Sequence, residues 1–207
     1  MKHLAILGAS GHGKVVADAA EAAGWQSIVF FDDAWPELGS NGRWDVVGGT
    51  RELVGRLNQF DGVVIGIGNN DIRQQKLAEL ADYGAPIVSI IHPRATVSPS
   101  AKIGAGSVLF AGSVVNADAV VGTGSIINTN AVVEHDCNVG LCCHVSPNGV
   151  LAGGVELGDL VWVGAGACVK QLLSAGRGAL IGMGAVVTKD VPSGATVAGN
   201  PARPLAR

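Results

Sequence analysis

The chain has 207 residues, a formal net charge of −3 and only 15% charged residues, with no basic run that would indicate nucleic-acid binding. No uninterrupted apolar segment approaches the roughly 20 residues that span a membrane, and no secretory leader precedes the first expected strand. All four cysteines fall inside one repeated segment, where they fit packing residues better than disulfides or zinc ligands. These features predict a cytoplasmic protein of one large or two small domains.

The start of the chain predicts a nucleotide-binding unit. An apolar strand over 3–8 leads into the turn Gly8-Ala9-Ser10-Gly11-His12-Gly13-Lys14 and a helix over 15–23, and a second strand over 27–31 ends at Asp32 and Asp33. A strand, a glycine turn and a helix point backbone N–H groups at a phosphate, and an acid about twenty residues further on is where dinucleotide-binding folds hold a ribose. The alternative is a purely structural turn, but the combination favours nucleotide binding.

The following segment completes a small α/β domain. We expect a loop over 34–44, a helix over 51–57, a strand over 62–68, a helix over 71–83 that is capped near Asp71 and stopped by Gly84, and a fourth strand over 86–91. The third strand leaves through Gly66-Ile67-Gly68-Asn69-Asn70, where a ligand could approach the backbone. Four strands in about 92 residues make half of a doubly wound dinucleotide fold, which favours one nucleotide or a nucleotide-sugar over NAD.

From Val97 to Val187 every sixth residue is Val, Ile or Leu, except Ala175. A period of six predicts a short parallel strand followed by a corner, and glycines that recur every eighteen residues, as at Gly122 and Gly140, predict three sides per coil. Successive coils would stack their inward aliphatics about 4.8 Å apart. A set of β-hairpins would instead alternate with a period of two. We therefore predict an α/β domain over 1–92 and a triangular β-prism over 93–207.

The residue before each inward aliphatic must point outward, and two of the three outward columns are apolar. One column contains Val114, Val132, Val150, Cys168 and Val186, and the second contains Val108, Ile126, His144, Trp162 and Leu180. The third is polar, with Lys102, Asn138, Glu156 and Ser174. Because solvent-facing walls are seldom so apolar, we expect other copies of the chain to cover two faces, most simply in a homotrimer.

Three consecutive ionisable residues, Glu134-His135-Asp136, interrupt a wall made otherwise of Val, Ala and Asn. A carboxylate can fix an imidazole in one tautomer and make it more basic, which suits a general base near neutral pH. The alternative is an exposed polar corner without a catalytic role. A second histidine, His144, lies nine residues on, half of a coil, so one chain places it on a different side of the prism from His135.

The motifs together resemble one family over essentially the whole chain, the bacterial nucleotide-sugar N-acetyltransferases of the PglD and NeuD kind, which include the acetyltransferase part of neisserial PglB. The resemblance rests on the turn over 8–14, the pair Asp32-Asp33, the run Gly66-Ile67-Gly68-Asn69-Asn70, His92-Pro93, Val133-Glu134-His135-Asp136-Cys137, His144-Val145-Ser146-Pro147, and the ending Val197-Ala198-Gly199-Asn200-Pro201-Ala202-Arg203. It implies that the prism is a left-handed parallel β-helix. The pattern departs from the repeat over 170–178, which leaves the coil shape there open.

The resemblance also implies an activity and site residues. The activity is transfer of acetyl from acetyl-CoA to the amine of a nucleotide-linked sugar, of the UDP-4-amino-4,6-dideoxy type, for bacterial glycan biosynthesis and without a metal. His135 would be the general base and Glu134 would raise its basicity, while a backbone N–H would stabilise the oxyanion. The residues expected at acetyl-CoA, bound between two subunits, are His144, Gly153, Ala165 and Met183. Those expected at the nucleotide-sugar are Ser10, Gly11, His12, Gly13, Lys14, Asp32, Asp33, Gly68 and Asn69.

Three other functions remain open from the sequence. An O-acetyltransferase would use the same prism and base. A zinc hydratase on such a prism needs three histidine ligands, whereas this prism offers His135 and His144. A nucleotide-sugar sensor would keep Asp32 and the glycine turn but tolerate the loss of His135. The choice between UDP and GDP, and the sugar carbon that carries the amine, also remain open.

Overall fold

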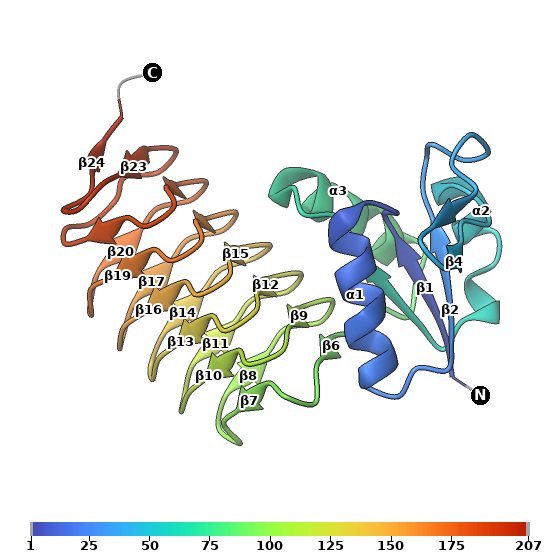
Figure 1. Cartoon of the computed structure of the whole chain (residues 1–207), viewed down its shortest axis with the longest axis horizontal. Helices are drawn as coiled ribbons and strands as arrows, with labels where there is room; N and C mark the ends of the chain where they lie inside the picture. Colours follow the sequence, from blue (N-terminus) through green and yellow to red (C-terminus); the bar gives the residue numbers. More distant parts are fainter. Residues whose placement is uncertain (1, 206–207) are drawn as a thin grey trace. The chain divides into compact units, whose positions relative to one another are not determined.

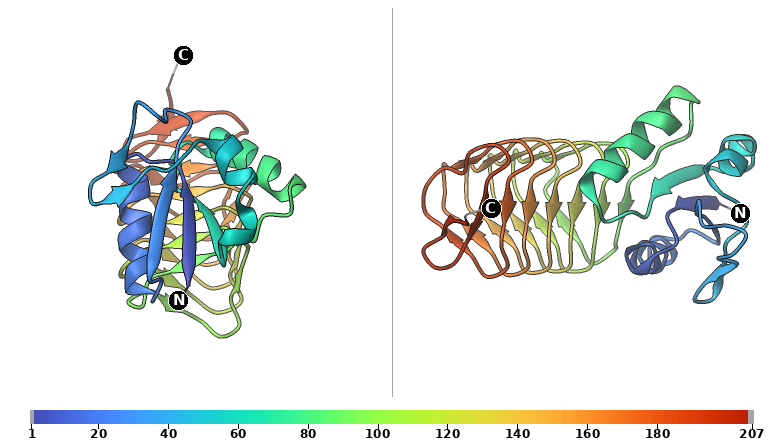
Figure 2. Two further views of the ribbon diagram at one scale, coloured as in Figure 1. Left: turned by 90° about the vertical axis from the view of Figure 1, so that its right-hand side faces the viewer. Right: turned by 90° about the horizontal axis from the view of Figure 1, so that it is seen from above.

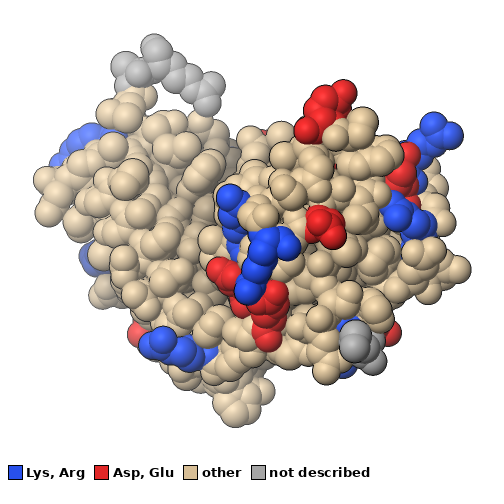
Figure 3. All heavy atoms as spheres, turned by 45° about the vertical axis from the view of Figure 1, so that its right-hand side comes forward, with Lys and Arg blue, Asp and Glu red and all other residues tan. Residues whose placement is uncertain are grey.

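A computed structural model of the chain describes residues 2–205 (Figure 1). The chain forms two compact units, one ending at Pro93 and the other beginning at Arg94. Charged residues make up 15% of the chain, and on the face shown in Figure 3 uncharged residues cover most of the surface. None of the helices over 2–205 combines the length and apolar character needed to cross a membrane.

The first unit contains a parallel three-stranded sheet, ordered β2-β1-β5, with helices in its connections. Its elements in chain order are β1 (His3–Leu7), α1 (Gly11–Ala22), β2 (Ser27–Phe31), β3 (Ser40–Asn41), β4 (Trp44–Asp45), α2 (Thr50–Val54), the 3₁₀ helix η1 (Leu57–Gln59), β5 (Gly62–Ile65), α3 (Asn70–Asp82) and β6 (Ile90–Ile91). Residues 4–7 of β1 and 63–65 of β5 are buried, as the short apolar runs predict for a central sheet.

Two expectations for this unit are wrong. The fourth strand is not added to the sheet, because the segment 86–91 pairs with β5 only through an isolated bridge between Val63 and Ile87. The expected loop over 34–44 contains β3, the first strand of an antiparallel hairpin with β4 in which Asn41 lies opposite Trp44. Gly42 at the tip has φ of +67°, which explains why a glycine-rich stretch forms a hairpin.

Two helix boundaries also differ from the sequence prediction. Helix α1 begins at Gly11, four residues early, so most of the glycine turn forms the first helical turn. Gly13 permits this close approach to β1, since a Cβ there would lie 2.3 Å from the Gly8 carbonyl oxygen. Helix α3 begins at Asn70, one residue before the expected start, and its cap lies near Asp71 as expected: Oδ1 of Asn69 accepts the Ile72 N–H at 3.0 Å.

The second unit is a prism whose coils stack side by side in Figure 2. Its strands over 96–187 have two residues each and pair in parallel, and the last strand, over 203–204, pairs antiparallel with a three-residue strand over 196–198. Its strands are β7 (Thr96–Val97), β8 (Lys102–Ile103), β9 (Val108–Leu109), β10 (Val114–Val115), β11 (Val120–Val121), β12 (Ile126–Ile127), β13 (Val132–Val133), β14 (Asn138–Val139), β15 (His144–Val145), β16 (Val150–Leu151), β17 (Glu156–Leu157), β18 (Trp162–Val163), β19 (Cys168–Val169), β20 (Ser174–Ala175), β21 (Leu180–Ile181), β22 (Val186–Val187), β23 (Thr196–Ala198) and β24 (Arg203–Pro204). Each strand from β7 to β22 ends at the residue that the sixfold count predicts to point inward.

Strands three apart in the chain pair in register, as β10 does with β13, and so build the three walls. The eighteen-residue glycine spacing has a steric cause. A Cβ on Gly122 would lie 2.5 Å from the Gly140 carbonyl oxygen, and one on Gly140 would lie 2.7 Å from the Asp159 nitrogen, so the next coil leaves no space for a side chain. The coil over 170–178, whose shape the sequence left open, continues the wall, because β20 pairs in register with β17 and Ala175 is buried.

The corners show a second sixfold pattern. Every sixth residue from Gly106 to Gly184 has a positive φ, and glycine, asparagine or aspartate fills most of these positions. These residue types adopt the left-handed conformation at least cost. Cys142, Leu160 and Leu172 are the other residues in this column, with φ of 50°, 60° and 60°.

The four cysteines are free thiols. Cys137 and Cys143 pack in the core and donate to carbonyl oxygens one coil on, while Cys168 is exposed on the outward column. We expected another chain to cover the whole apolar outward column from Val108 to Leu180, and this is wrong for its first half. Val108 and Ile126 are already buried within this chain, whereas Trp162 and Leu180 remain about 40% exposed.

Candidate active site

His135 lies on an exposed corner of the prism, two residues after the end of β13. Its Nδ1 is 2.7 Å from Oδ2 of Asp136, which has a left-handed φ of 58°. Because an ionised carboxylate only accepts hydrogen bonds, Nδ1 carries the proton, and Nε2 of the neutral ring has a free lone pair. The hydrogen bond to Asp136, and the negative charges of Asp136 and Glu134, raise the pKa of His135.

Glu134 has a different partner. Its Oε2 accepts a hydrogen bond from Nδ2 of Asn116 at 2.8 Å. The carboxylate bonded to His135 is therefore Asp136, and Glu134 acts on the imidazole only through its charge. Asn116 was missed in the sequence, although it lies eighteen residues before Glu134 and the coil period places the two side by side.

Gly153 lies directly against the imidazole ring of His135. A Cβ on Gly153 would lie 2.6 Å from both Cε1 and Nε2 of His135, so a side chain at that position would displace the ring. The ring opens into a hollow of about 510 Å³, lined by Glu134, His135, Asp136, Ala152, Gly153, Gly154, Gln171 and Leu172. This hollow has room for a reacting group beside the basic nitrogen.

His144 occupies a different environment, on β15 and almost buried. Its ring stacks on Trp162 with centroids 5.2 Å apart, and Nε2 is 3.0 Å from Nδ2 of Asn128. The Thr129 N–H donates to Oδ1 of Asn128, which turns the amide nitrogen towards the histidine. His144 Nε2 is therefore the acceptor, and Nδ1 carries the ring proton. Trp162 lies eighteen residues after His144, so the coil period could have identified it.

An apolar hollow of about 300 Å³ lies beside this stack. Its lining residues are Ser146, Pro147, Trp162, Gly164, Ala165, Leu180, Ile181, Gly182 and Met183. It shares no lining residue with the hollow of His135. Of the four residues expected at acetyl-CoA, Ala165 and Met183 line the apolar hollow and Gly153 lines the hollow of His135, so one chain divides them between two places.

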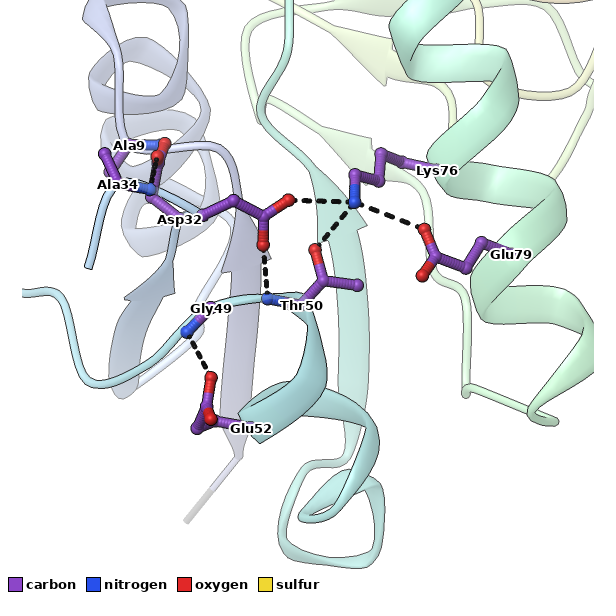
Figure 4. Close-up of polar contacts among 9 residues, drawn as sticks. Ala9, Asp32, Ala34, Gly49, Thr50, Glu52, Lys76 and Glu79 are labelled. Carbon is purple, nitrogen blue, oxygen red and sulfur yellow. Dashed lines mark hydrogen bonds and ion pairs between the residues drawn. The ribbon is translucent and has the colours of Figure 1, made fainter. Parts of the chain in front are cut away.

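In the first unit, Asp32 holds the glycine turn at the end of β2. Its Oδ2 accepts the Ala9 N–H at 2.7 Å and its Oδ1 accepts the Ala34 N–H at 3.0 Å, as Figure 4 shows. Two backbone donors leave lone pairs on both oxygens, since a carboxylate has about four. Asp32 can therefore order the turn and still accept a hydrogen bond from a ligand.

Asp33 takes part in a second cluster, which connects three elements. Its Oδ1 accepts the Thr50 N–H at 2.7 Å, and its Oδ2 pairs with Nζ of Lys76 at 2.9 Å. Lys76 also donates to Oγ1 of Thr50 and pairs with Glu79 on α3 (Figure 4). Despite partial desolvation, the Thr50 N–H and Lys76 lower the pKa of Asp33. Lys76 gave no signal in the sequence, because its partners are distant along the chain.

A buried arginine, Arg73, lies close enough to the glycine turn to act on His12. Arg73 of α3 is 1% exposed and donates to the carbonyl oxygens of Ile67 and Gly68, each at 3.0 Å, and to Oδ1 of Asn70 at 2.7 Å. It holds the loop after β5 in place. Desolvation, with the positive charge of Arg73, lowers the pKa of His12 to about 4, so His12 is neutral at pH 7.

The remaining residues expected at the nucleotide-sugar lie on the same unit. Ser10 is the N-cap residue of α1 and accepts from Nδ2 of Asn41 through its carbonyl oxygen. Gly11 and Lys14 are exposed in the first turn of α1, and Asn69 caps α3. Over 2–205, no group of three or more His, Cys, Asp or Glu side chains is arranged to hold a metal ion.

Known proteins match the chain over its whole length. The family model of the PglD N-terminal domain matches residues 3–80. The acetyltransferase domain of PglB from Neisseria gonorrhoeae FA1090 superposes with a TM-score of 0.93 and 45% identity, over 99% of this chain and 100% of that one. That domain has also been solved in complex with acetyl coenzyme A.

A second solved structure is PerB from Caulobacter crescentus in complex with CoA and GDP-perosamine. It has a TM-score of 0.93 and 36% identity, over 100% of this chain and 98% of that one. A curated relative, UDP-N-acetylbacillosamine N-acetyltransferase of Bacillus subtilis (strain 168), is 37% identical over 116 residues, and the match spans about half of that protein, 52%. The predicted fold, an α/β domain followed by a left-handed parallel β-helix, is confirmed. The chain therefore belongs to the family of acetyl-CoA-dependent nucleotide-sugar N-acetyltransferases.

Proposed function

We propose that this protein transfers the acetyl group of acetyl-CoA to the amine of a nucleotide-linked amino sugar, with His135 as the general base. The observation that carries the proposal is the pair of His135 and Asp136, with Nδ1 and Oδ2 2.7 Å apart, beside a hollow that both residues line. An exposed imidazole with a raised pKa is a competent base near neutral pH.

The residues support a simple reaction sequence. The sugar amine attacks the thioester carbonyl and forms the C–N bond, while Nε2 of His135 accepts the proton that the amine loses. A backbone N–H stabilises the tetrahedral oxyanion. The C–S bond then breaks, the thiolate of coenzyme A leaves, and the proton on His135 can neutralise it. The negative charges of Asp136 and Glu134 stabilise the imidazolium between these steps.

The two hollows support an active site shared between copies of the chain. The hollow beside His135 and the apolar hollow share no residue within one prism, yet each is lined by residues expected at acetyl-CoA. Packing of one prism against the next in a homotrimer would bring the two hollows together. Half-exposed Trp162 and Leu180 supply apolar surface for that contact.

The shared site can be tested by mixing two inactive chains. A His135→Ala chain co-expressed with a His144→Ala chain should regain activity, because some interfaces of a mixed trimer contain both histidines. A mixture no more active than either variant alone, with mixed trimers confirmed by native mass spectrometry, would contradict the shared site.

The first unit is proposed to hold the nucleotide-sugar through Asp32, Asp33 and the first turn of α1, with Gly68 and Asn69 nearby. The lone pairs left on Asp32 and the exposed backbone at Gly11 support this assignment. The resemblance favours a UDP-linked 4-amino-4,6-dideoxy sugar as the acceptor, with GDP as the alternative nucleotide. The names of the relatives include both UDP and GDP sugars, so the acceptor must be found by experiment.

The deciding experiment measures thiol release from acetyl-CoA with a panel of UDP- and GDP-linked amino sugars. We expect one amino sugar to be acetylated at least tenfold faster than its analogue with a hydroxyl in place of the amine. Equal or faster acetylation of the hydroxyl analogue would identify an O-acetyltransferase. Binding of a nucleotide-sugar without turnover would identify a sensor. A role in glycan biosynthesis in the cytoplasm follows from the proposed acceptor.

A further inference from the structure

The glycine turn and the loop after β5, residues 66–70, pack against each other with no room for side chains between them. A Cβ on Gly8 would lie 2.5 Å from Cγ1 of Ile67. A Cβ on Gly66 would lie 2.8 Å from the Gly8 carbonyl oxygen and 3.0 Å from Cα of Gly13. Because the two segments are in direct contact, a shift of the loop after β5 would disturb the glycine turn as well.

Arg73 of α3 fixes the conformation of this loop. Its Nη1 donates to the carbonyl oxygens of Ile67 and Gly68, and its Nη2 donates to Oδ1 of Asn70. A guanidinium presents its N–H donors in a fixed fork, so one side chain sets the direction of two successive carbonyl groups. Because Arg73 is only 1% exposed, it leaves almost no surface for a ligand to touch.

The two carbonyl groups determine where the next two N–H groups point. In a trans peptide the N–H points away from the carbonyl oxygen of the same peptide plane, and both peptides here are trans. The carbonyls of Ile67 and Gly68 are directed at Arg73. The N–H groups that share their peptide planes, those of Gly68 and Asn69, therefore point away from the guanidinium. Within residues 2–205 neither N–H donates to another group, so both are available to a ligand.

Gly68 and Asn69 belong to the proposed nucleotide-sugar site. The anionic acceptor in a nucleotide-sugar is its diphosphate, and backbone N–H groups are suitable donors to phosphate oxygens. The glycine turn, against which this loop packs, is itself predicted to direct N–H groups at a phosphate. The direction of the Gly68 and Asn69 N–H groups should therefore affect the affinity for the nucleotide, although the side chain that sets this direction is buried.

We infer that Arg73 is a positioning residue for the nucleotide-sugar. By holding the carbonyl groups of Ile67 and Gly68, it directs the N–H groups of Gly68 and Asn69 towards the diphosphate without touching the ligand itself. This inference rests on the proposed function for the nature of the ligand. It adds a residue that contacts neither substrate but is needed for tight binding of one of them.

The test measures binding of UDP and of GDP to the full chain by calorimetry, without acetyl-CoA. Arg73→Met keeps a long side chain but removes every donor. It should weaken binding of the nucleotide that the wild type binds about tenfold, the effect of one lost hydrogen bond to a charged group. Arg73→Lys keeps the charge and some donors but lacks the fork, so its loss should be smaller. Coenzyme A also contains a diphosphate, but it is proposed to bind the prism, so its affinity should be the same in all variants.

Leu80→Ala is the matched control for a loss of stability. Leu80 is fully buried on the same helix, about two turns after Arg73. Its truncation should lower the melting temperature and leave the nucleotide affinity unchanged. A lower melting temperature with unchanged affinity in Arg73→Met would make Arg73 a structural residue and overturn the inference, as would an equal loss of affinity in Leu80→Ala. If Arg73→Met does not fold, the comparison of Arg73→Lys with the wild type decides the question.

Because binding is measured without turnover, failure of this inference can be told apart from failure of the proposed function. A wild type that binds a nucleotide but acetylates no amino sugar would refute the proposed function and leave the result on Arg73 valid. Unchanged nucleotide binding in both Arg73 variants would refute the role of Arg73 alone. A wild type that binds neither UDP nor GDP would refute the nucleotide-sugar site and the role of Arg73 together.

Discussion

The two units of this protein hold their candidate site residues in different ways. In the prism, His135 and Asp136 pair with each other on one exposed corner, and the His135 side chain is 62% exposed. In the first unit, Asp32, Asp33 and Arg73 bind backbone groups of elements that are distant in the chain. Substitutions in the prism should therefore change chemistry with little effect on folding, whereas those in the first unit should change both.

The substitution His135→Ala is the strongest test of the expectation that changes in the prism affect activity but not folding. Loss of the general base should lower turnover by roughly 10²–10⁴. The melting temperature should stay the same, because the imidazole is exposed and its partner, Asp136, is on the same corner. Steady-state kinetics and thermal unfolding measure the two effects. Near-normal turnover in the folded variant would remove His135 from the mechanism.

Gly153→Ala should have the next largest effect. The added Cβ would lie 2.6 Å from the imidazole, so the ring must move away from its present position. Misplacement of a catalytic group by about 1 Å can cost about 10² in rate, and we expect a loss of roughly 10–100-fold in kcat. Gly39→Ala, where a Cβ meets nothing within 4 Å, is the control. A variant with full activity would show that the ring position is not critical.

In contrast to the prism variants, Asp32→Ala should change both substrate binding and the stability of the fold. It leaves the Ala9 and Ala34 N–H groups without their acceptor, at a cost of about 1–3 kcal/mol if water does not replace it. The KM for the nucleotide-sugar should rise about tenfold, and that for acetyl-CoA should stay the same. Equal effects on both substrates would contradict a separate nucleotide-sugar unit.

His12 should make the first unit sensitive to acid. Its pKa is about 4 in the folded chain against 6.5 for a free imidazole, so the unfolded state binds more protons between these values. Stability is therefore full above pH 6.5 and falls by about 3 kcal/mol as the pH drops to about 4. Urea unfolding at pH 7 and pH 4.5 measures this loss, which should be smaller in His12→Asn. An equal loss in the variant would assign the acid sensitivity to other groups.

The repeat made the prism predictable from sequence, whereas the first unit was predictable only in outline. Each strand of the prism is set by neighbours six and eighteen residues away, so a local count locates its inward residues and even Ala175. The segment 86–91, which joins the three-stranded sheet only through an isolated bridge, and the early start of α1 depend on packing between distant segments, which no local pattern records. Lys76 and Arg73 were missed for the same reason.

The candidate site was predictable as a position but not as a set of contacts. The break in the repeat identified residues 134–136, yet three adjacent residues cannot reveal which carboxylate reaches the imidazole. The left-handed backbone at Asp136 turns its side chain back to Nδ1, whereas Glu134 pairs with Asn116 one coil earlier. The corner conformation therefore decided the partner, and it could have been predicted from the sixfold recurrence of Gly, Asn and Asp.

The smallest expected effect separates the two carboxylates. Asp136→Asn removes the negative charge beside His135 and weakens the hydrogen bond that is the first cause of its raised pKa, because an amide oxygen accepts less strongly than a carboxylate. Glu134→Gln removes only a charge that makes no hydrogen bond to the imidazole. Because the base must be neutral to accept a proton, a lower pKa moves the acid limb of the kcat/KM profile to lower pH. The acid limb should therefore shift to lower pH in both variants, and further in Asp136→Asn than in Glu134→Gln. The plateau of kcat/KM should also be lower, because the base is weaker. A larger shift in Glu134→Gln would give the main role back to Glu134, and an upward shift in either variant would contradict a carboxylate that raises the basicity of His135.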